Sequence, residues 1–220
     1  DLNVGTAAVA MDFGTLTFTS AGAVSISETS STSLSGTSTA DSLALTSAGA
    51  LTNVASASLT VTNNANLNAT CIDLGNQASD TMNFGTLTYN SVGAVSIAEN
   101  SAMVITGTNT ADSLTLSSTA GITDAAATSQ TVTNDASFSG TSVVLADNAA
   151  DVLSVGGNAS FSASAAGAVT IAAAGAANFG TLTFNTTGTV SITEDSGMDI
   201  VGVNTGGTTS LTSSAGISDA

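Results

Sequence analysis

Polar and apolar residues alternate along most of the chain in short runs. The segments 15–19, 24–27 and 59–62 place Val, Leu, Ile or Phe at every second position, with Ser or Thr between them. This two-residue period is typical of β-strands, and no segment shows the 3.6-residue apolar stripe of an amphipathic helix. Gly, Asn and Asp interrupt the runs at 63–64, 134–135 and 156–158, where they indicate turns.

The sequence contains three copies of one long repeat, which start at Phe13, Phe84 and Phe179. The copies align without a gap for 42 residues, and their starts are 71 and 95 residues apart. Shorter similarities recur about every 24 residues, so the longer spacing contains one added unit, at about 155–178. A chain that gains a unit without disturbing its neighbours is built by stacking, which indicates a solenoid.

These features predict an all-β fold, a right-handed parallel β-helix (β-solenoid) that forms a single array over residues 1–220. We expect about nine coils of roughly 18–28 residues, with three short strands each, in a rod about 45 Å long. The segment 2–5 is similar to 72–75, which precedes a repeat copy, and 219–220 matches 124–125, where a copy continues. We therefore expect uncapped ends that stack onto copies of the same protein end to end, or onto the rest of a longer repeat array.

The composition excludes several classes of function. The chain has 16 acidic residues and no Lys, Arg, His, Pro or Trp, which gives a formal net charge of −16. Nucleic-acid binding depends on Lys and Arg that neutralise phosphates, so no nucleic-acid partner is expected. Ser–His–Asp, Cys–His, Schiff-base and Walker-type sites need side chains that this chain lacks, and zinc loses most of its usual ligands. The sequence therefore predicts that the protein is not an enzyme.

The most apolar segment, 163–177, is rich in Ala and is interrupted by two Gly. A membrane-spanning helix needs about 20 apolar residues, so we expect no membrane insertion. We interpret the chain as a mature secreted protein, or as part of a longer one.

Two tracts, 134–151 and 180–196, resemble the filamentous-haemagglutinin-like adhesins and related β-strand-repeat proteins of bacterial surfaces. The resemblance implies secretion to the cell surface or extracellular space, a right-handed β-helix, and a role in adhesion or in an extracellular filament. Two hypotheses follow. The chain is a structural component of a filament or surface fibre, or it is an adhesin shaft that recognises a glycan or another surface ligand.

Divalent cations are a further candidate partner, although an acidic, solvated turn is the simpler interpretation of the residues concerned. Glu194, Asp195 and Asp199 gather three acids within six residues, and calcium takes several carboxylate and carbonyl oxygens. They are the candidate calcium ligands, although the equivalent Glu28 and Glu99 lack neighbouring acids. No other cofactor is predicted, and no catalytic residue.

Further residues allow a functional and a simpler interpretation. Asp147 with Asp151, or Asp73 with Asp80, could form the carboxylate pair of a glycosidase. With no Trp and one Tyr the chain offers few aromatic platforms for a polysaccharide, so acidic turns are favoured. Cys71, the only cysteine, is expected to be a free thiol facing outward or at a corner.

Two patterns of Thr and Asn also allow both a functional and a simpler interpretation. Thr-x-Thr pairs at 15–17, 86–88 and 181–183 could bind ice, but β-propensity explains them more simply. Asn68, Asn158 and Asn185 match the glycan acceptor pattern, which an Asn- and Thr-rich chain contains by chance.

Overall fold

The computed structural model describes residues 1–5 and 11–219, and within these ranges it contains 24 β-strands and no helix. The first twelve strands are β1 (Leu2–Val4), β2 (Val24–Glu28), β3 (Thr32–Leu34), β4 (Thr37–Ala40), β5 (Leu43–Ser47), β6 (Ala50–Asn53), β7 (Ser58–Ala69), β8 (Cys71–Leu74), β9 (Thr81–Ser91), β10 (Val95–Glu99), β11 (Met103–Ile105) and β12 (Thr108–Ala111). The other twelve are β13 (Leu114–Ser118), β14 (Ile122–Asp124), β15 (Ser129–Val132), β16 (Ala136–Gly140), β17 (Val143–Leu145), β18 (Val152–Ala163), β19 (Val169–Ile171), β20 (Ala176–Asn185), β21 (Val190–Glu194), β22 (Met198–Ile200), β23 (Thr209–Ser213) and β24 (Ile217–Asp219).

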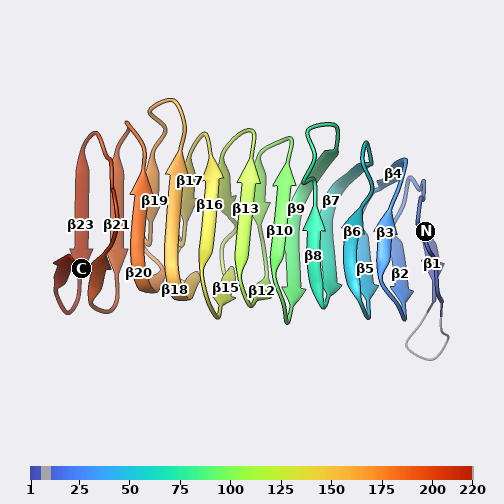
Figure 1. Cartoon of the computed structure of the whole chain (residues 1–220), viewed down its shortest axis with the longest axis horizontal. Coiled ribbons are helices and arrows are strands. Elements are labelled where there is room, and N and C mark those ends of the chain that lie inside the picture. Colours follow the sequence, from blue (N-terminus) through green and yellow to red (C-terminus); the bar gives the residue numbers. More distant parts are fainter. Residues whose placement is uncertain (6–10, 220) are drawn as a thin grey trace.

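The strands stack as successive coils of a rod, with the N-terminus near one end and the C-terminus near the other (Figure 1). Strands pair in parallel with the coils next to them, as β5 does with both β2 and β7. The coils differ in length, since one step of the stack joins Leu182 to Ile200 and a longer one joins Val143 to Val169. The predicted parallel β-solenoid is therefore confirmed, whereas the right-handed sense of its coil stays a prediction.

The stack contains about ten coils, one more than the sequence predicts. The strand pairings that connect β1 with β23 pass through ten steps. The difference arises because some coils are shorter than the unit suggested by the repeat spacing. The coil that brings Leu43 onto Val24 is one of these.

The first two copies of the long repeat do not place equivalent strands above one another. Starting at β2, the column of paired strands runs through β5, β7 and β9 to β11. The strand equivalent to β2 in the second copy is β10, which instead pairs with β8 and β13 in another column. The distance along the chain from Phe13 to Phe84 is thus three coils and part of a fourth. Equivalent side chains of these two copies therefore lie on different faces of the rod.

One continuous apolar core fills the inside of the coils. Alternation places every second side chain in it, and β10 shows this as buried and half-buried positions in turn. Three aromatic rings of neighbouring coils pack on one another, with centroids 5.4 Å apart for Phe138 and Phe161 and 5.6 Å apart for Phe161 and Phe179. This burial of apolar surface is the main stabilising contribution to the fold.

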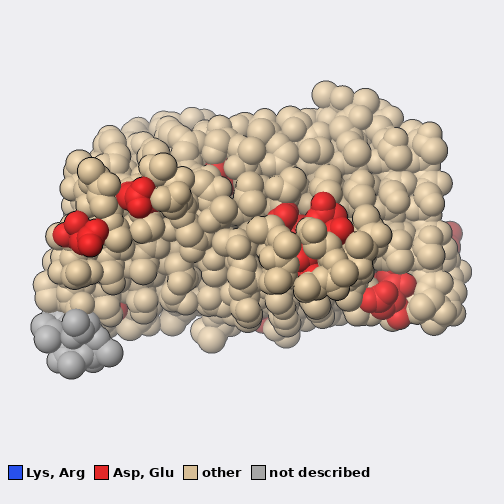
Figure 2. All heavy atoms as spheres, turned by 180° about the vertical axis from the view of Figure 1, so that it is seen from behind, with Lys and Arg blue, Asp and Glu red and all other residues tan. Residues whose placement is uncertain are grey.

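The outer surface is polar but carries little charge. Figure 2 shows acidic side chains in small, separate groups on one face, with no Lys or Arg. Identical positions of stacked strands lie about 4.8 Å apart, so columns of like charges would repel one another. Ser, Thr and Asn avoid that cost.

The match between 219–220 and 124–125 includes Ala220, which lies outside the described residues.

Candidate metal centre

The expected calcium ligands do not lie together. Glu194 is buried at the end of β21, with 1% of its surface exposed, whereas Asp195 is exposed and Asp199 is half-buried. Among the described residues, the one group of three acidic ligand atoms within 4.8 Å of one another lies elsewhere, so calcium binding at Glu194 remains an untested prediction.

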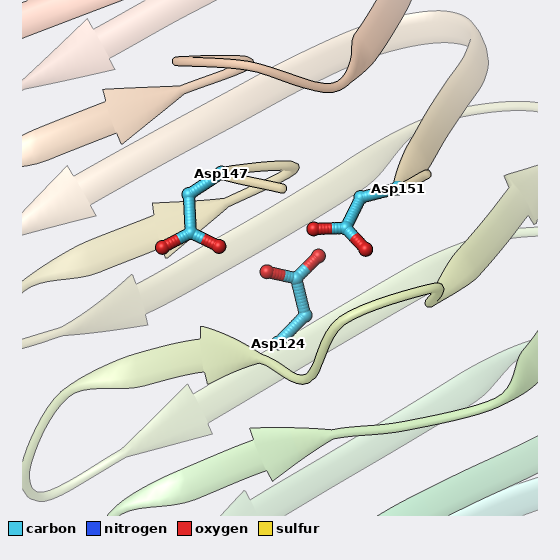
Figure 3. A group of neighbouring side chains, drawn as sticks. All are labelled: Asp124, Asp147 and Asp151. Carbon is cyan, nitrogen blue, oxygen red and sulfur yellow. The ribbon is translucent and has the colours of Figure 1, made fainter. Parts of the chain in front are cut away.

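That group consists of Asp124, Asp147 and Asp151. Asp124 ends β14, and the other two lie in the loop between β17 and β18, one coil further along the rod. Figure 3 shows the three carboxylates pointing toward one another from these segments. Asp151 is 1% exposed, Asp124 is half-buried and Asp147 is exposed, so the cluster reaches from the interior to the surface.

Backbone N–H groups hold two of the carboxylates in place. Asp151 accepts a hydrogen bond from Thr128 at 3.0 Å through Oδ1, and from Asn148 at 2.8 Å through Oδ2. Asp124 accepts one from Ala146 at 3.0 Å through Oδ2. Its Oδ1 is buried and has no hydrogen-bond donor.

The electrostatics of the cluster are unfavourable for three ionised carboxylates. Burial raises the pKa of Asp124 to about 6, and the negative charges of Asp151 and Asp147 add to the shift, while the Ala146 N–H opposes it. Asp124 therefore titrates close to neutrality. A cation or a proton beside Oδ1 would remove the free-energy cost of holding an ionised carboxylate there.

The first repeat copy contains a counterpart of this cluster in which two of the three carboxylates are replaced by amides. In the alignment of the first two copies, Asn53 corresponds to Asp124, Asn76 to Asp147 and Asp80 to Asp151. Asn53 donates from Nδ2 to Asp80 Oδ2 at 2.8 Å, and its Oδ1 accepts the N–H of Gly75 at 2.9 Å. In the second copy a carboxylate oxygen, Asp124 Oδ1, takes the place of that amide donor.

This arrangement can perform two kinds of chemistry. It can share a proton between carboxylates, or it can offer oxygen ligands to a hard cation. Calcium binds oxygens at about 2.3–2.6 Å, so ligands on opposite sides of the ion are about 5 Å apart. Oxygens within 4.8 Å of one another fit that requirement, and the exposed Asp147 leaves the cluster open to solvent.

A second feature recurs in all three repeat copies. Glu28, Glu99 and Glu194 occupy one repeat position and are 2%, 2% and 1% exposed. Each accepts the N–H of the Phe that starts its copy, at 2.9, 3.0 and 3.0 Å, and the hydroxyl of the Ser two residues later. Oε2 of Glu99 and of Glu194 is buried without a partner.

The other predicted residues belong to neither of these two features. Asp73 accepts a hydrogen bond from Asn76 at 2.9 Å, while Asp80 is buried and bonded to Asn53. Cys71 is a half-buried free thiol. The acceptor Asn68 is half-buried in β7.

No protein-family model, curated protein or solved structure matches this chain. In the described residues there is no helix long and apolar enough to span a membrane.

Proposed function

We propose that this chain is a structural segment of an extracellular filament or surface fibre and has no catalytic role. The observation that carries the proposal is the parallel ladder, which links β1 to β24 around one apolar core. The hydrogen bonds between coils run along the rod, so a load along the axis is shared by the strands of every coil.

The stacking also supplies a means of extension. Each coil presents a parallel edge of N–H and C=O groups to the next, and that edge accepts any coil of similar shape. A further coil from a longer array, or from another copy of this protein, can therefore be added by the pairing that already joins β13 to β16.

The chemistry of the surface supports a structural role. Ser, Thr and Asn cover the rod, and the chain has none of the imidazole or amine groups that most catalytic mechanisms use. The loop that carries two of the three acids, 146–151, contains no aromatic residue that could stack on a sugar ring. This disfavours a glycosidase.

An adhesin shaft is the second candidate, and a surface groove favours it. The groove has a volume of about 320 Å³ and crosses β5, β7 and β9 near their C-terminal ends. It is lined by the amides Asn68 and Asn90, by hydroxyl groups, and by Val92, which is 85% exposed. Amides beside an exposed apolar group are a suitable surface for a sugar.

Electron cryo-microscopy of the purified chain and of the native material tests the structural proposal. We expect filaments with a repeat near 4.8 Å along the axis. Leu116→Asp is the matched control, because Leu116 is fully buried and a charge there disrupts the coil. Particles that stay single rods in the native material would contradict the proposal.

Binding of the isolated chain to a glycan array distinguishes the second candidate. Binding that is lost in an Asn68→Ala, Asn90→Ala variant with unchanged circular dichroism supports an adhesin shaft. Filaments together with a silent array support the structural role.

A further inference from the structure

Glu99 ends β10 at a corner of the coil, before β11 begins at Met103. Its Oε1 accepts hydrogen bonds from the Phe84 N–H of the neighbouring coil at 3.0 Å and from the Ser101 hydroxyl at 2.6 Å. Its Oε2 is buried and has no donor. The side chain is 2% exposed, so an ionised carboxylate there has lost its hydration. The negative charge on Oε2 would then have no hydrogen bond to stabilise it.

The first repeat copy shows what this oxygen lacks. The equivalent Glu28 is equally buried, and its Oε2 accepts a hydrogen bond from the hydroxyl of Thr32. In the alignment of the two copies Thr32 corresponds to Met103, which has no hydroxyl and is fully buried. One residue difference between the copies therefore removes the donor and leaves the rest of the hydrogen-bonding pattern in place.

The surroundings of Glu99 provide no positive charge. The titratable groups on the elements packed around it are Asp73 on β8, Tyr89 on β9 and Asp80 just before β9. Asp80 is 3% exposed and, like Glu99, lines a cavity of about 300 Å³ at this corner. Asp80 Oδ1 is also buried without a donor among the described residues.

We propose that Glu99 is a proton-holding group of the solenoid, which keeps its proton to higher pH than an exposed glutamate and loosens the corner between β10 and β11 when it ionises. Burial raises the pKa of Glu99, and the hydrogen bonds from Ser101 and Phe84 oppose that shift. A carboxyl group whose pKa is raised by folding stabilises the fold fully below its unfolded pKa. This stabilisation is lost as the pH rises through the folded value.

Carbon-13 NMR of protein labelled only at the Glu carboxyl carbon tests the proposal directly. The chain has three Glu, one in each repeat copy, and Glu99→Gln assigns the Glu99 signal. In EDTA, which removes cations, we expect this signal to titrate at higher pH in the folded protein than in urea-unfolded protein. Equal or lower titration in the folded protein overturns the proposal.

Two exchanges between the copies provide matched variants. Met103→Thr restores the hydroxyl and moves the Glu99 titration to lower pH, while Thr32→Met removes the donor to Glu28 Oε2 and should destabilise the first copy. If Met103→Thr does not fold, the wild-type titration of Glu99 still decides the question. A Glu99 titration that is unchanged in folded Met103→Thr refutes the role of the missing donor.

Hydrogen exchange measures the loosening itself. The Phe84 N–H is held by Glu99, so its protection, corrected for the intrinsic rate, falls by up to about tenfold per pH unit between the unfolded and folded titration midpoints of Glu99 and levels off above the folded one. In Glu99→Gln, which has no proton to lose, the protection is independent of pH. The same pH dependence in both proteins overturns the proposed coupling.

Discussion

Asp124→Asn is expected to stabilise the solenoid, although it removes a charge from a candidate metal centre. The change gives the second repeat copy the residue that the first copy has at Asn53. There the amide donates to Asp80 at 2.8 Å. In the variant the new amide takes the place of the unpartnered Asp124 Oδ1 and can donate to Asp151.

The magnitude follows from the titration of Asp124. Burial first, and then the charges of Asp151 and Asp147, raise its pKa from 3.8 to about 6. At about 1.4 kcal/mol per pH unit this difference corresponds to about 3 kcal/mol above pH 7. Because Asp124 is only partly buried, solvent screening reduces the value to about 1–2 kcal/mol. For a chain of this size, the melting temperature then rises by about 3–6 °C.

The pH dependence distinguishes this mechanism from general stabilisation. Because the carboxyl pKa of Asp124 is raised in the folded state, this group stabilises the folded wild type below about pH 4. The stabilisation is lost as the pH rises through about 6. The advantage of Asp124→Asn should therefore be absent at pH 4 and complete at pH 7.5. Thermal unfolding followed by circular dichroism in EDTA measures both values.

The reverse exchange, Asn53→Asp, is the matched control. It introduces a second carboxylate beside Asp80, so it should lower the melting temperature at pH 7.5 and have less effect at pH 4. Two results would refute the reasoning: a variant Asp124→Asn no more stable than the wild type at pH 7.5, or a gain of equal size at both pH values.

Three further outcomes are expected. Millimolar calcium should raise the melting temperature of the wild type but not of Asp124→Asn, and equal shifts in both proteins would exclude binding at this cluster. Phe161→Ala should lower the free energy of unfolding by about 3–5 kcal/mol in urea titrations, because Phe161 is fully buried between two other rings; a loss below about 1 kcal/mol would contradict this packing. Gly85→Ala should cost about 1–3 kcal/mol in the same assay, because a Cβ would lie 2.1 Å from the Thr62 carbonyl oxygen. Gly14→Ala, the same change in the first copy, meets nothing within 4 Å and should be nearly neutral, so equal costs would contradict the argument.

The fold could be predicted from the sequence because it depends on local pattern. Period-two alternation specifies strands with one apolar face. Because the repeated units contain no helices to cover these faces, the units bury them by stacking on one another. The phase of the repeats could not be predicted in this way. It depends on the length of chain that each corner takes, and the short coil from Leu182 to Ile200 and the long one from Val143 to Val169 share the same strand pattern.

The acidic cluster was only partly predictable. Asp147 and Asp151 attract attention as neighbours in sequence, but Asp124 lies a full coil earlier in the chain and joins them because the coils stack. A signal was nevertheless present, since aligning the copies shows two Asn of the first copy replaced by Asp in the second. The burial of Glu194 also follows from alternation, because it continues the inward series of Val190 and Ile192.

The two acidic features have the same consequence for the stability of the solenoid. The chain has no cationic side chain, so whatever compensates Asp124 or Glu99 must come from the surrounding solution. Only a proton or a metal ion can do so, and each is present at a concentration set by the medium. We therefore expect the coils around residues 99–151 to connect the stability of the rod to external pH and cations, whereas the first copy, with Asn53 and Thr32, satisfies the same positions from within the chain.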